Sequence, residues 1–449
     1  MVTNKNDGSP CRYNKDQKKV IEADKGCHLV LAGAGTGKTF TMVERVTYLL
    51  ETKQFLPSQL LILTFSRKAA DELRQRIEKR CGLERGTVMA TTFHAFSLYL
   101  LRRFCNDSMP GLTVIDDDKS KDILAALAGK MRDRFLGIPV PVILGIHSQY
   151  RQGKTKLFSG YAGETGEHVK KLDLEYREYK KEHGLVDFND MINHSIELLT
   201  REPALREQLQ AEYQYILVDE FQDTSTNNFQ LLSLLVPEQS PLLMVVGDDW
   251  QSIYGFRNAK VEYIINMKRH FNAVQVFKLT RNYRSRKEIL NLAGNIIRRN
   301  RVRTRKRVFA TTGKGGIVRG YAVKNIKEEA RRVVELLEKN HPADHDTAIL
   351  FRNNWQGELI QKEVANHYDE TGNSPQFMTI HASKGLEFHT VILAGIRDGI
   401  FPDPSTDIEE ERRLLYVACT RAKERLFVIY HLTSEDEPPL FARESGFKN

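Results

Sequence analysis

The sequence has few cysteines and lacks long apolar runs, and both absences exclude classes of protein. Neither a disulfide framework nor a metal site fits the spacing of the five cysteines, which are Cys11, Cys27, Cys81, Cys105 and Cys419. Scattered thiols of this kind are typical of a reduced, intracellular protein. No run of about 18 apolar residues could form a transmembrane helix, and the first seventeen residues are too polar for a secretory signal. We therefore expect a cytoplasmic protein without membrane association.

What is present indicates a folded protein of several domains. The chain has 449 residues, of which 41% are hydrophobic and 28% are charged, a balance typical of globular proteins. At roughly 100–200 residues per domain, this length allows two to four domains. The 67 Lys and Arg residues exceed the 58 Asp and Glu residues by nine. This net charge favours a polyanionic partner but does not identify one.

Short apolar runs alternate with helical patterns through most of the chain. Several runs are apolar throughout, as expected for parallel strands that are covered on both faces. The predicted strands are residues 28–31, 60–64, 215–218, 242–246, 274–279, 348–351, 391–393 and 425–430. Residues 67–80 and 328–339 have helical spacing and mixed charge. The pattern predicts an α/β fold with two parallel-sheet units.

The segment from 93 to 200 differs from its surroundings. It is rich in Leu, Lys, Arg and Glu, and helical periodicity is clear in residues 120–135 and 168–181. Few strand-like runs occur there. We therefore predict a mostly helical insertion that interrupts the first α/β unit.

Residues 29–39 read LVLAGAGTGKT, an apolar run followed by a glycine-rich turn and the start of a helix. The glycines let successive backbone N–H groups point at phosphate oxygens, and the helix N-terminus adds its partial positive charge. Lys38 can reach the β- and γ-phosphates, and the Thr39 hydroxyl can ligate Mg²⁺. The predicted nucleotide loop comprises Ala32, Gly33, Ala34, Gly35, Thr36, Gly37, Lys38 and Thr39, with Ala32 in a place where the strict pattern has glycine.

A pair of carboxylates follows another predicted strand in the segment YILVDE, residues 215–220. Asp219 is placed to hold Mg²⁺, and Glu220 to activate an attacking water. Together with the glycine-rich loop, this pair predicts hydrolysis of a nucleoside triphosphate.

Further motifs decide between the kinds of P-loop protein. They are DEFQDT (219–224), GDDWQSIYGFRNA (247–259), LTRNYRS (279–285), TIHASKGLEF (379–388) and ERRLLYVACTRAKERL (411–426). With Gln17 in YNKDQKKVI, LTFSRKAADELRQRI (63–77) and TTFHAF (91–96), they resemble superfamily 1 DNA helicases of the UvrD/Rep/PcrA type, in the family's order. The variant GDDWQSIYG is most similar to the helicase IV branch. The resemblance implies two RecA-like P-loop NTPase domains and ATP-dependent 3′→5′ movement along single-stranded DNA.

The resemblance also implies roles at the nucleotide. Catalysis would involve Lys38, Glu220 and three further residues: the γ-phosphate sensor Gln251 and the arginine fingers Arg284 and Arg421. The remaining nucleotide contacts would be Gln17 at the adenine edge, Tyr283 stacked on the base, Arg257 near the γ-phosphate and Glu387 at the ribose. Charge that develops on the γ-phosphate would be neutralised by guanidinium groups from across a cleft, so hydrolysis would require closure.

Single-stranded DNA binding needs basic groups for phosphates and aromatic faces for bases. The candidates are Phe65, Arg67, Thr92, Phe93, His94, Tyr254, Phe256, His381 and Ser383. Relatives commonly have Trp at the Phe256 position, so base stacking is expected to be weaker here. Ordinary core packing is an alternative for Phe65 and Phe93, and these residues do not exclude RNA as the track.

The sequence does not decide the role of two further stretches. Residues 298–307, RRNRVRTRKR, carry seven basic side chains in ten positions, which fits either a phosphate-binding patch or a solvated helix end. Residues 187–190 lie in the segment LVDFND, which is similar to a family element without assigned chemistry.

The family comparison also predicts the domain boundaries. The first motor domain (1A) would comprise residues 1–92 and 201–277, the helical insertion (1B) 93–200, and the second motor domain (2A) 278–449. Relatives carry a large 2B insertion within the second motor domain, which is absent here or reduced to a loop near 369–375. Phe40 also replaces an arginine that relatives commonly have beside the adenine.

Other functions compete with unwinding. A translocase that strips proteins from single-stranded DNA or remodels recombination intermediates would need no 2B element. A binding module gated by ATP and a P-loop metabolic kinase are further alternatives. We expect a monomer that acts on single-stranded DNA and on junctions with duplex, with ATP and Mg²⁺ as cofactors.

Overall fold

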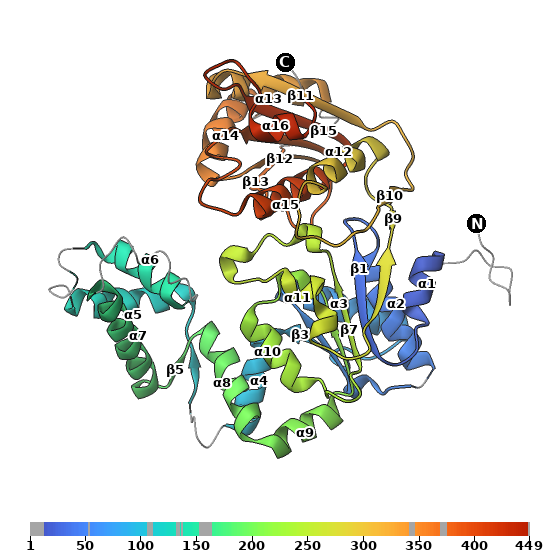
Figure 1. The fold of residues 1–449 in the computed structure, drawn as a ribbon, viewed down its shortest axis with the longest axis vertical. Coiled ribbons are helices and arrows are strands. Elements are labelled where there is room, and N and C mark those ends of the chain that lie inside the picture. The colour runs from blue at the N-terminus through green and yellow to red at the C-terminus, as the bar shows by residue number, and fades with distance from the viewer. Residues whose placement is uncertain are drawn as a thin grey trace.

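The computed structural model describes residues 13–52, 54–105, 111–131, 135, 138–151, 164–340, 346–368 and 375–447. Two parallel sheets lie one above the other in Figure 1, and a group of helices stands apart on one side. Cys11 and most of the stretch 369–375 lie outside the described residues. Within the described ranges, no helix combines the length and apolar character needed to cross a bilayer.

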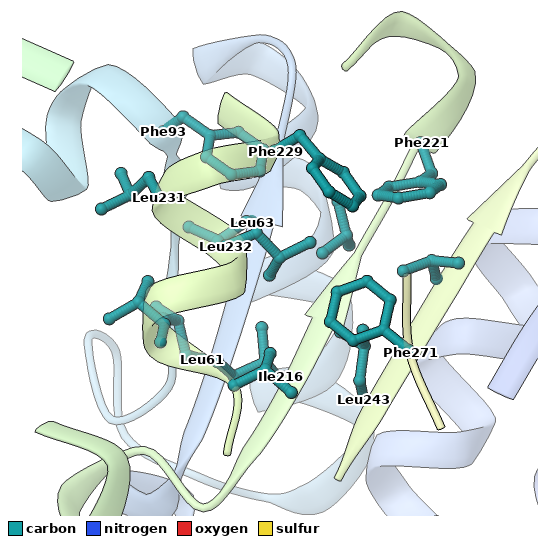
Figure 2. Packing of buried hydrophobic residues seen from close by; sticks show 14 of the residues in the cluster. Leu61, Leu63, Phe93, Ile216, Phe221, Phe229, Leu231, Leu232, Leu243 and Phe271 are labelled. Atoms are coloured by element: carbon teal, nitrogen blue, oxygen red, sulfur yellow. The ribbon is translucent and has the colours of Figure 1, made fainter. Parts of the chain in front are cut away.

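The first sheet has six parallel strands in the order β3 (Met89–Thr92), β2 (Leu60–Thr64), β6 (Tyr215–Val218), β7 (Leu243–Gly247), β1 (Cys27–Ala32) and β8 (Gln275–Leu279). Because successive side chains point to opposite faces, Leu29 and Leu31 join one buried cluster while Val30 and Ala32 join another. Figure 2 shows the first of these clusters. Burial on both faces explains why these strands are continuous apolar runs.

Helices cover both faces of this sheet. One face packs against α1 (Lys15–Ile21), α2 (Lys38–Glu51) and α3 (Arg67–Cys81). The other packs against α4 (Phe93–Phe104), α8 (Phe188–Arg201), α9 (Pro203–Glu212), α10 (Thr226–Leu235) and α11 (Glu262–Ile265). This arrangement leaves the carboxyl edge of the strands to carry the glycine-rich loop and the DEFQDT motif.

The second sheet has five parallel strands in the order β11 (Ile317–Val323), β15 (Ala422–His431), β14 (Phe388–Ile396), β12 (Thr347–Phe351) and β13 (Gln376–Thr379). One face packs against α12 (Lys287–Ile297), α15 (Ile408–Cys419) and α16 (Leu440–Glu444). The other packs against α13 (Ile326–Asn340) and α14 (Asn354–Tyr368). The chain crosses between the sheets at β9 (Arg281–Asn282), which pairs with β10 (Phe309–Ala310).

The group of helices at the left of Figure 1 consists of α5 (Asp117–Lys130), α6 (Val140–Arg151) and α7 (Glu164–Glu182). They enclose a hydrophobic core of their own, and the short strands β4 (Thr113–Val114) and β5 (Leu185–Val186) join this unit to the rest. Helices α4 and α8 instead pack into the core of the first sheet. The helices that form a separate core therefore cover a shorter part of the chain than the predicted insertion, residues 93–200.

All eight predicted strands occur, whereas the two-residue strands β4, β5, β9 and β10 and three edge strands of the two large sheets were not predicted. Their burial explains why: β3, β11 and β13 lie at the edges of their sheets and are only partly buried. Edge strands need no continuous apolar run, so the pattern that identified the central strands is missing from them.

Candidate active site and DNA-facing surface

The glycine-rich loop connects β1 to α2, which begins at Lys38. Gly35 and Gly37 have φ values of 64° and 83°, in the left-handed region that favours glycine. A Cβ at Gly35 would lie 2.6 Å from Arg284 Cβ, and one at Gly37 would lie 2.8 Å from Gln17 Nε2. The loop therefore needs glycine both for its backbone shape and for its close neighbours.

The loop lysine meets the catalytic carboxylate predicted for the neighbouring motif. Lys38 Nζ donates to Glu220 Oε2 at 3.0 Å. Glu220 directly follows β6 and Asp219, and its backbone has a φ of 49°, a conformation that costs energy for a residue other than glycine. Burial opposes ionisation of Glu220, but the Lys38 and Lys384 charges hold its pKa below the ordinary value. Glu220 is thus ionised and able to accept a proton from water.

Asp219 and Thr39 offer oxygen ligands of the kind that Mg²⁺ prefers. Burial and the Glu220 charge raise the pKa of Asp219, so a dication here would favour its ionised form. Among the described residues, no group of three or more His, Cys, Asp or Glu side chains is placed to hold a metal ion. The donors present therefore fit a Mg²⁺ whose remaining ligands are phosphates and water.

Two arginines of the second unit face this edge of the first sheet. Arg421 Nη2 donates to Gln251 Oε1 at 3.1 Å, and Arg284 Nε donates to Glu387 Oε2 at 2.6 Å. Burial and the nearby Arg284 charge lower the pKa of Arg421 to about 9. Arg421 thus stays charged at neutral pH although the Arg284 charge opposes it, and bound polyphosphate would relieve that repulsion.

The residues predicted to hold the base lie beside the loop. Tyr283 is 47% exposed, and its hydroxyl accepts from Asn14 Nδ2 at 2.6 Å. Gln17 is buried: its Oε1 accepts from Asn14 N at 3.0 Å, and its Nε2 donates to Thr36 O at 3.4 Å. In this conformation the amide braces the loop. Glu387 accepts from Lys423 through Oε1 and from Arg284 through Oε2. It therefore orients Arg284, which is one of the two predicted arginine fingers.

Four predicted DNA contacts gather at the junction between the two units. Phe65 stacks on Tyr254 with ring centroids 5.1 Å apart, and His381 lies edge-on to Phe256 at 5.4 Å. Arg257 Cζ lies 5.6 Å from the centroids of both the Tyr254 and Phe256 rings. Arg257, which was predicted near the γ-phosphate, thus contacts two rings of this aromatic group.

The structure places the other predicted DNA contacts less uniformly. Arg67 is exposed in the first turn of α3, whereas the Thr92 hydroxyl caps α4 by accepting from Ala95 N at 3.2 Å. Phe93 is only 5% exposed and lies within the core shown in Figure 2. In this position the ring cannot stack on a base. Phe93 therefore fits ordinary core packing, which was the alternative to a DNA contact. His94 packs edge-on against Phe188, and Ser383 is fully buried.

Sequence patterns did not single out a set of buried charges between the two units. The set comprises Asp223, Asp248, Asp249, Lys306 and Lys384. Lys306 Nζ lies 2.6 Å from an oxygen of each of Asp248 and Asp249. Both aspartates belong to the segment GDDWQS and follow a buried strand. Two adjacent acidic residues at such a place could have predicted a buried cation beside them.

The basic run 298–307 divides into inward and outward groups. Lys306 is buried, and Arg303 Nε donates to Asn300 O. The exposed members include Arg299, Arg301, Arg305 and Arg307. The run is thus neither wholly a solvated linker nor wholly a surface patch.

The fold and the site define a P-loop nucleotide hydrolase whose reactive groups come from two sheets. Residues 13–272 match the UvrD/REP helicase N-terminal domain, and residues 277–368 and 365–433 match the UvrD-like helicase C-terminal domain. The chain therefore belongs to the UvrD/REP helicase family.

Similar proteins include helicases of several bacteria. A "Probable DNA helicase" of Mycoplasma pneumoniae is 31% identical over 93% of this chain and 83% of that protein. The "ATP-dependent DNA helicase PcrA" of Staphylococcus aureus and that of Staphylococcus epidermidis are each 29% identical over 78% of this chain. The chain spans about half the length (49%) of these PcrA relatives.

Proposed function

We propose that this protein is an ATP-dependent DNA helicase that moves 3′→5′ along single-stranded DNA and separates strands at junctions. It would act as a monomer with ATP and Mg²⁺. The observation that carries the proposal is the contact of Arg421, from the second unit, with Gln251, from the first, beside the pair of Lys38 and Glu220. Hydrolytic groups divided between two units make turnover depend on how the units meet.

In the proposed reaction, Lys38 would bind the β- and γ-phosphates, and Thr39 and Asp219 would hold Mg²⁺, which would supply charge neutralisation. Glu220 takes the proton of the attacking water. Arg284 and Arg421 neutralise the γ-phosphate as the bond to the leaving group breaks. Loss of that phosphate removes the anion that holds both arginines at the cleft, so the second unit is free to shift.

The DNA track would run over the aromatic group of Phe65, Tyr254, Phe256 and His381. Aromatic faces hold bases without sequence preference, which suits a motor that must release each base. The group contains residues of both units, so relative movement of the units would displace the bound strand. This supports the proposed division into two motor units, 1A and 2A.

A strand-displacement assay tests the proposal. Duplexes with a 3′ or a 5′ single-stranded tail are incubated with ATP and Mg²⁺, and Glu220→Gln serves as the inactive control. The proposal expects displacement from the 3′-tailed duplex alone. Displacement from the 5′-tailed duplex alone would contradict the direction, and ATP-independent displacement would contradict the mechanism.

One observation favours a second candidate, a translocase that displaces proteins and unwinds weakly. The match to the C-terminal family domain comes in two segments that meet at residues 365–368, with no long insertion between them. This supports the proposed absence of 2B. Removal of streptavidin from a biotinylated single strand, faster than tailed-duplex unwinding, would favour this candidate.

A further inference from the structure

Lys384 crosses from the second unit into the first and is nearly buried there. It lies between β13 and β14, and its side chain is 9% exposed. Its Nζ lies 2.5 Å from Asp223 Oδ2 and 3.0 Å from Gln251 O. Both partners belong to motifs of the first sheet, so one ammonium joins the two units at two points.

On one side, these contacts lead to the catalytic carboxylate. Gln222 Nε2 donates to Glu220 Oε2 at 2.6 Å and lies 3.4 Å from Asp223 Oδ2, the same oxygen that Lys384 holds. Gln222 Oε1 accepts from Asp248 N at 2.8 Å, which fixes the orientation of the amide. The position of Glu220 therefore depends on a side chain that is itself held between two aspartates.

On the other side, the same ammonium touches the aromatic group. Lys384 Nζ lies 4.7 Å from the centroid of the Tyr254 ring, within the range of a cation–π contact. Tyr254 in turn stacks on Phe65. A base that stacked on this group would change the surroundings of an ammonium that also bonds Asp223.

The pair is not easily replaced. Asp223 is 3% exposed, and its Oδ1 has no hydrogen-bond partner among the described atoms. Without Lys384, a buried carboxylate would lose its ion-pair partner next to Glu220, and such a loss is strongly destabilising locally. The buried Asp223 carboxylate thus needs the Lys384 ammonium as long as the two units keep this arrangement.

We propose that Lys384 is a positioning residue that couples DNA occupancy to ATP hydrolysis, through Asp223 and Gln222 to Glu220. The proposal rests on the proposed function, because it assumes that the aromatic group binds DNA. It predicts that the DNA stimulation of ATP turnover is lost when the ammonium is removed, whereas affinity for ATP without DNA is kept.

The test compares wild type with Lys384→Met, Lys384→Arg and the matched surface control Lys324→Met, since Lys324 forms only an exposed ion pair. For each, ATP turnover and KM for ATP are measured with and without oligo-dT. The expected result for Lys384→Met is a fall of about tenfold in the ratio of DNA-stimulated to DNA-free turnover, a size typical of coupled buried groups. Lys384→Arg should recover part of the ratio, and Lys324→Met should keep all of it.

A double-mutant cycle with Asp223→Asn separates positioning from plain destabilisation. If Lys384 and Asp223 act as one unit, the double variant should lose no more stimulation than the worse single variant. An unchanged ratio of DNA-stimulated to DNA-free turnover in Lys384→Met, or additive losses in the double variant, would overturn the inference. The proposed function would still stand in that case, provided that DNA stimulates the wild type. A wild type that DNA does not stimulate would overturn both.

Discussion

The predicted nucleotide side and the predicted DNA side of the junction are built from different kinds of contact. On the nucleotide side, charges pair at short distances, as in the half-buried pair of Lys38 with Glu220 and the buried contacts of Lys306 with two aspartates. On the DNA side, partly exposed aromatic rings pack at centroid distances between 5 and 6 Å. Buried ion pairs fix geometry, whereas aromatic faces tolerate many ligands.

This contrast suits a motor. Hydrolysis needs groups placed within a few tenths of an ångström, and unpaired buried charges would penalise any misplacement. A strand that must slide needs contacts of similar strength for every base. The two sides meet at Lys384, where an ion pair and a cation–π contact share one nitrogen.

The largest effect is expected from Glu220→Gln. Loss of the general base should lower ATP turnover by about 10²–10⁴-fold, while the uncharged amide keeps nearly the same shape. ATP affinity, measured with a fluorescent nucleotide, should change far less than turnover. Turnover within about threefold of wild type would show that another group accepts the proton.

Removal of Lys306 should break the charged side in a different way. Lys306→Met leaves two buried aspartates without their cation, so the free energy of unfolding should fall by about 3–5 kcal/mol. Arg305→Met is the matched control, because Arg305 is exposed on the same segment. Urea unfolding measures both variants, and equal stability of the two would contradict the role given to Lys306.

Phe256→Ala should weaken DNA binding by less. A stacked base contributes about 1–3 kcal/mol, so the Kd for oligo-dT should rise by about 5- to 150-fold. Phe256→Trp should tighten binding slightly. Phe309→Ala provides the control because Phe309 is also exposed (57%, against 49% for Phe256) but lies at the crossing between the sheets. A similar loss in both variants would show that general surface hydrophobicity governs binding.

The smallest effect concerns pH. Burial and the nearby Arg352 charge lower the pKa of His381 to about 4, below the ordinary value of about 6.5. A lowered histidine pKa means that the ring stays neutral until the pH falls toward 4. The ratio of DNA affinities of wild type and His381→Phe should therefore be constant between pH 8 and pH 6. A gain for wild type near pH 6.5 would show that His381 binds DNA as a cation.

The central strands and the loop-centred chemistry were predictable because each depends on local sequence. Continuous apolar runs identified β1, β2, β6 and β7, and GKT placed Lys38 at a helix start. Contacts between distant segments were not predictable. Nothing near Lys306 or Lys384 in the sequence indicates which acid it meets, and Phe93 looks the same whether it faces a base or the core.

The two sides also differ in how well their residues could be assigned. The predicted nucleotide contacts are tied to short motifs. Arg257 follows Tyr254 and Phe256 in the motif GDDWQSIYGFRNA, but it was predicted to lie near the γ-phosphate. Its guanidinium lies over rings. Side-chain direction after a turn depends on tertiary packing, which spacing in a sequence does not specify.

ATP turnover with single-stranded DNA, with RNA of the same sequence and without nucleic acid tests the central claim most directly. Shared contacts join the predicted hydrolytic groups to the aromatic group proposed as the DNA track, so turnover should rise severalfold or more with DNA and stay low without it. Glu220→Gln should remove the DNA-dependent part. Equal turnover in all three conditions would contradict the claim that this enzyme couples hydrolysis to movement on DNA.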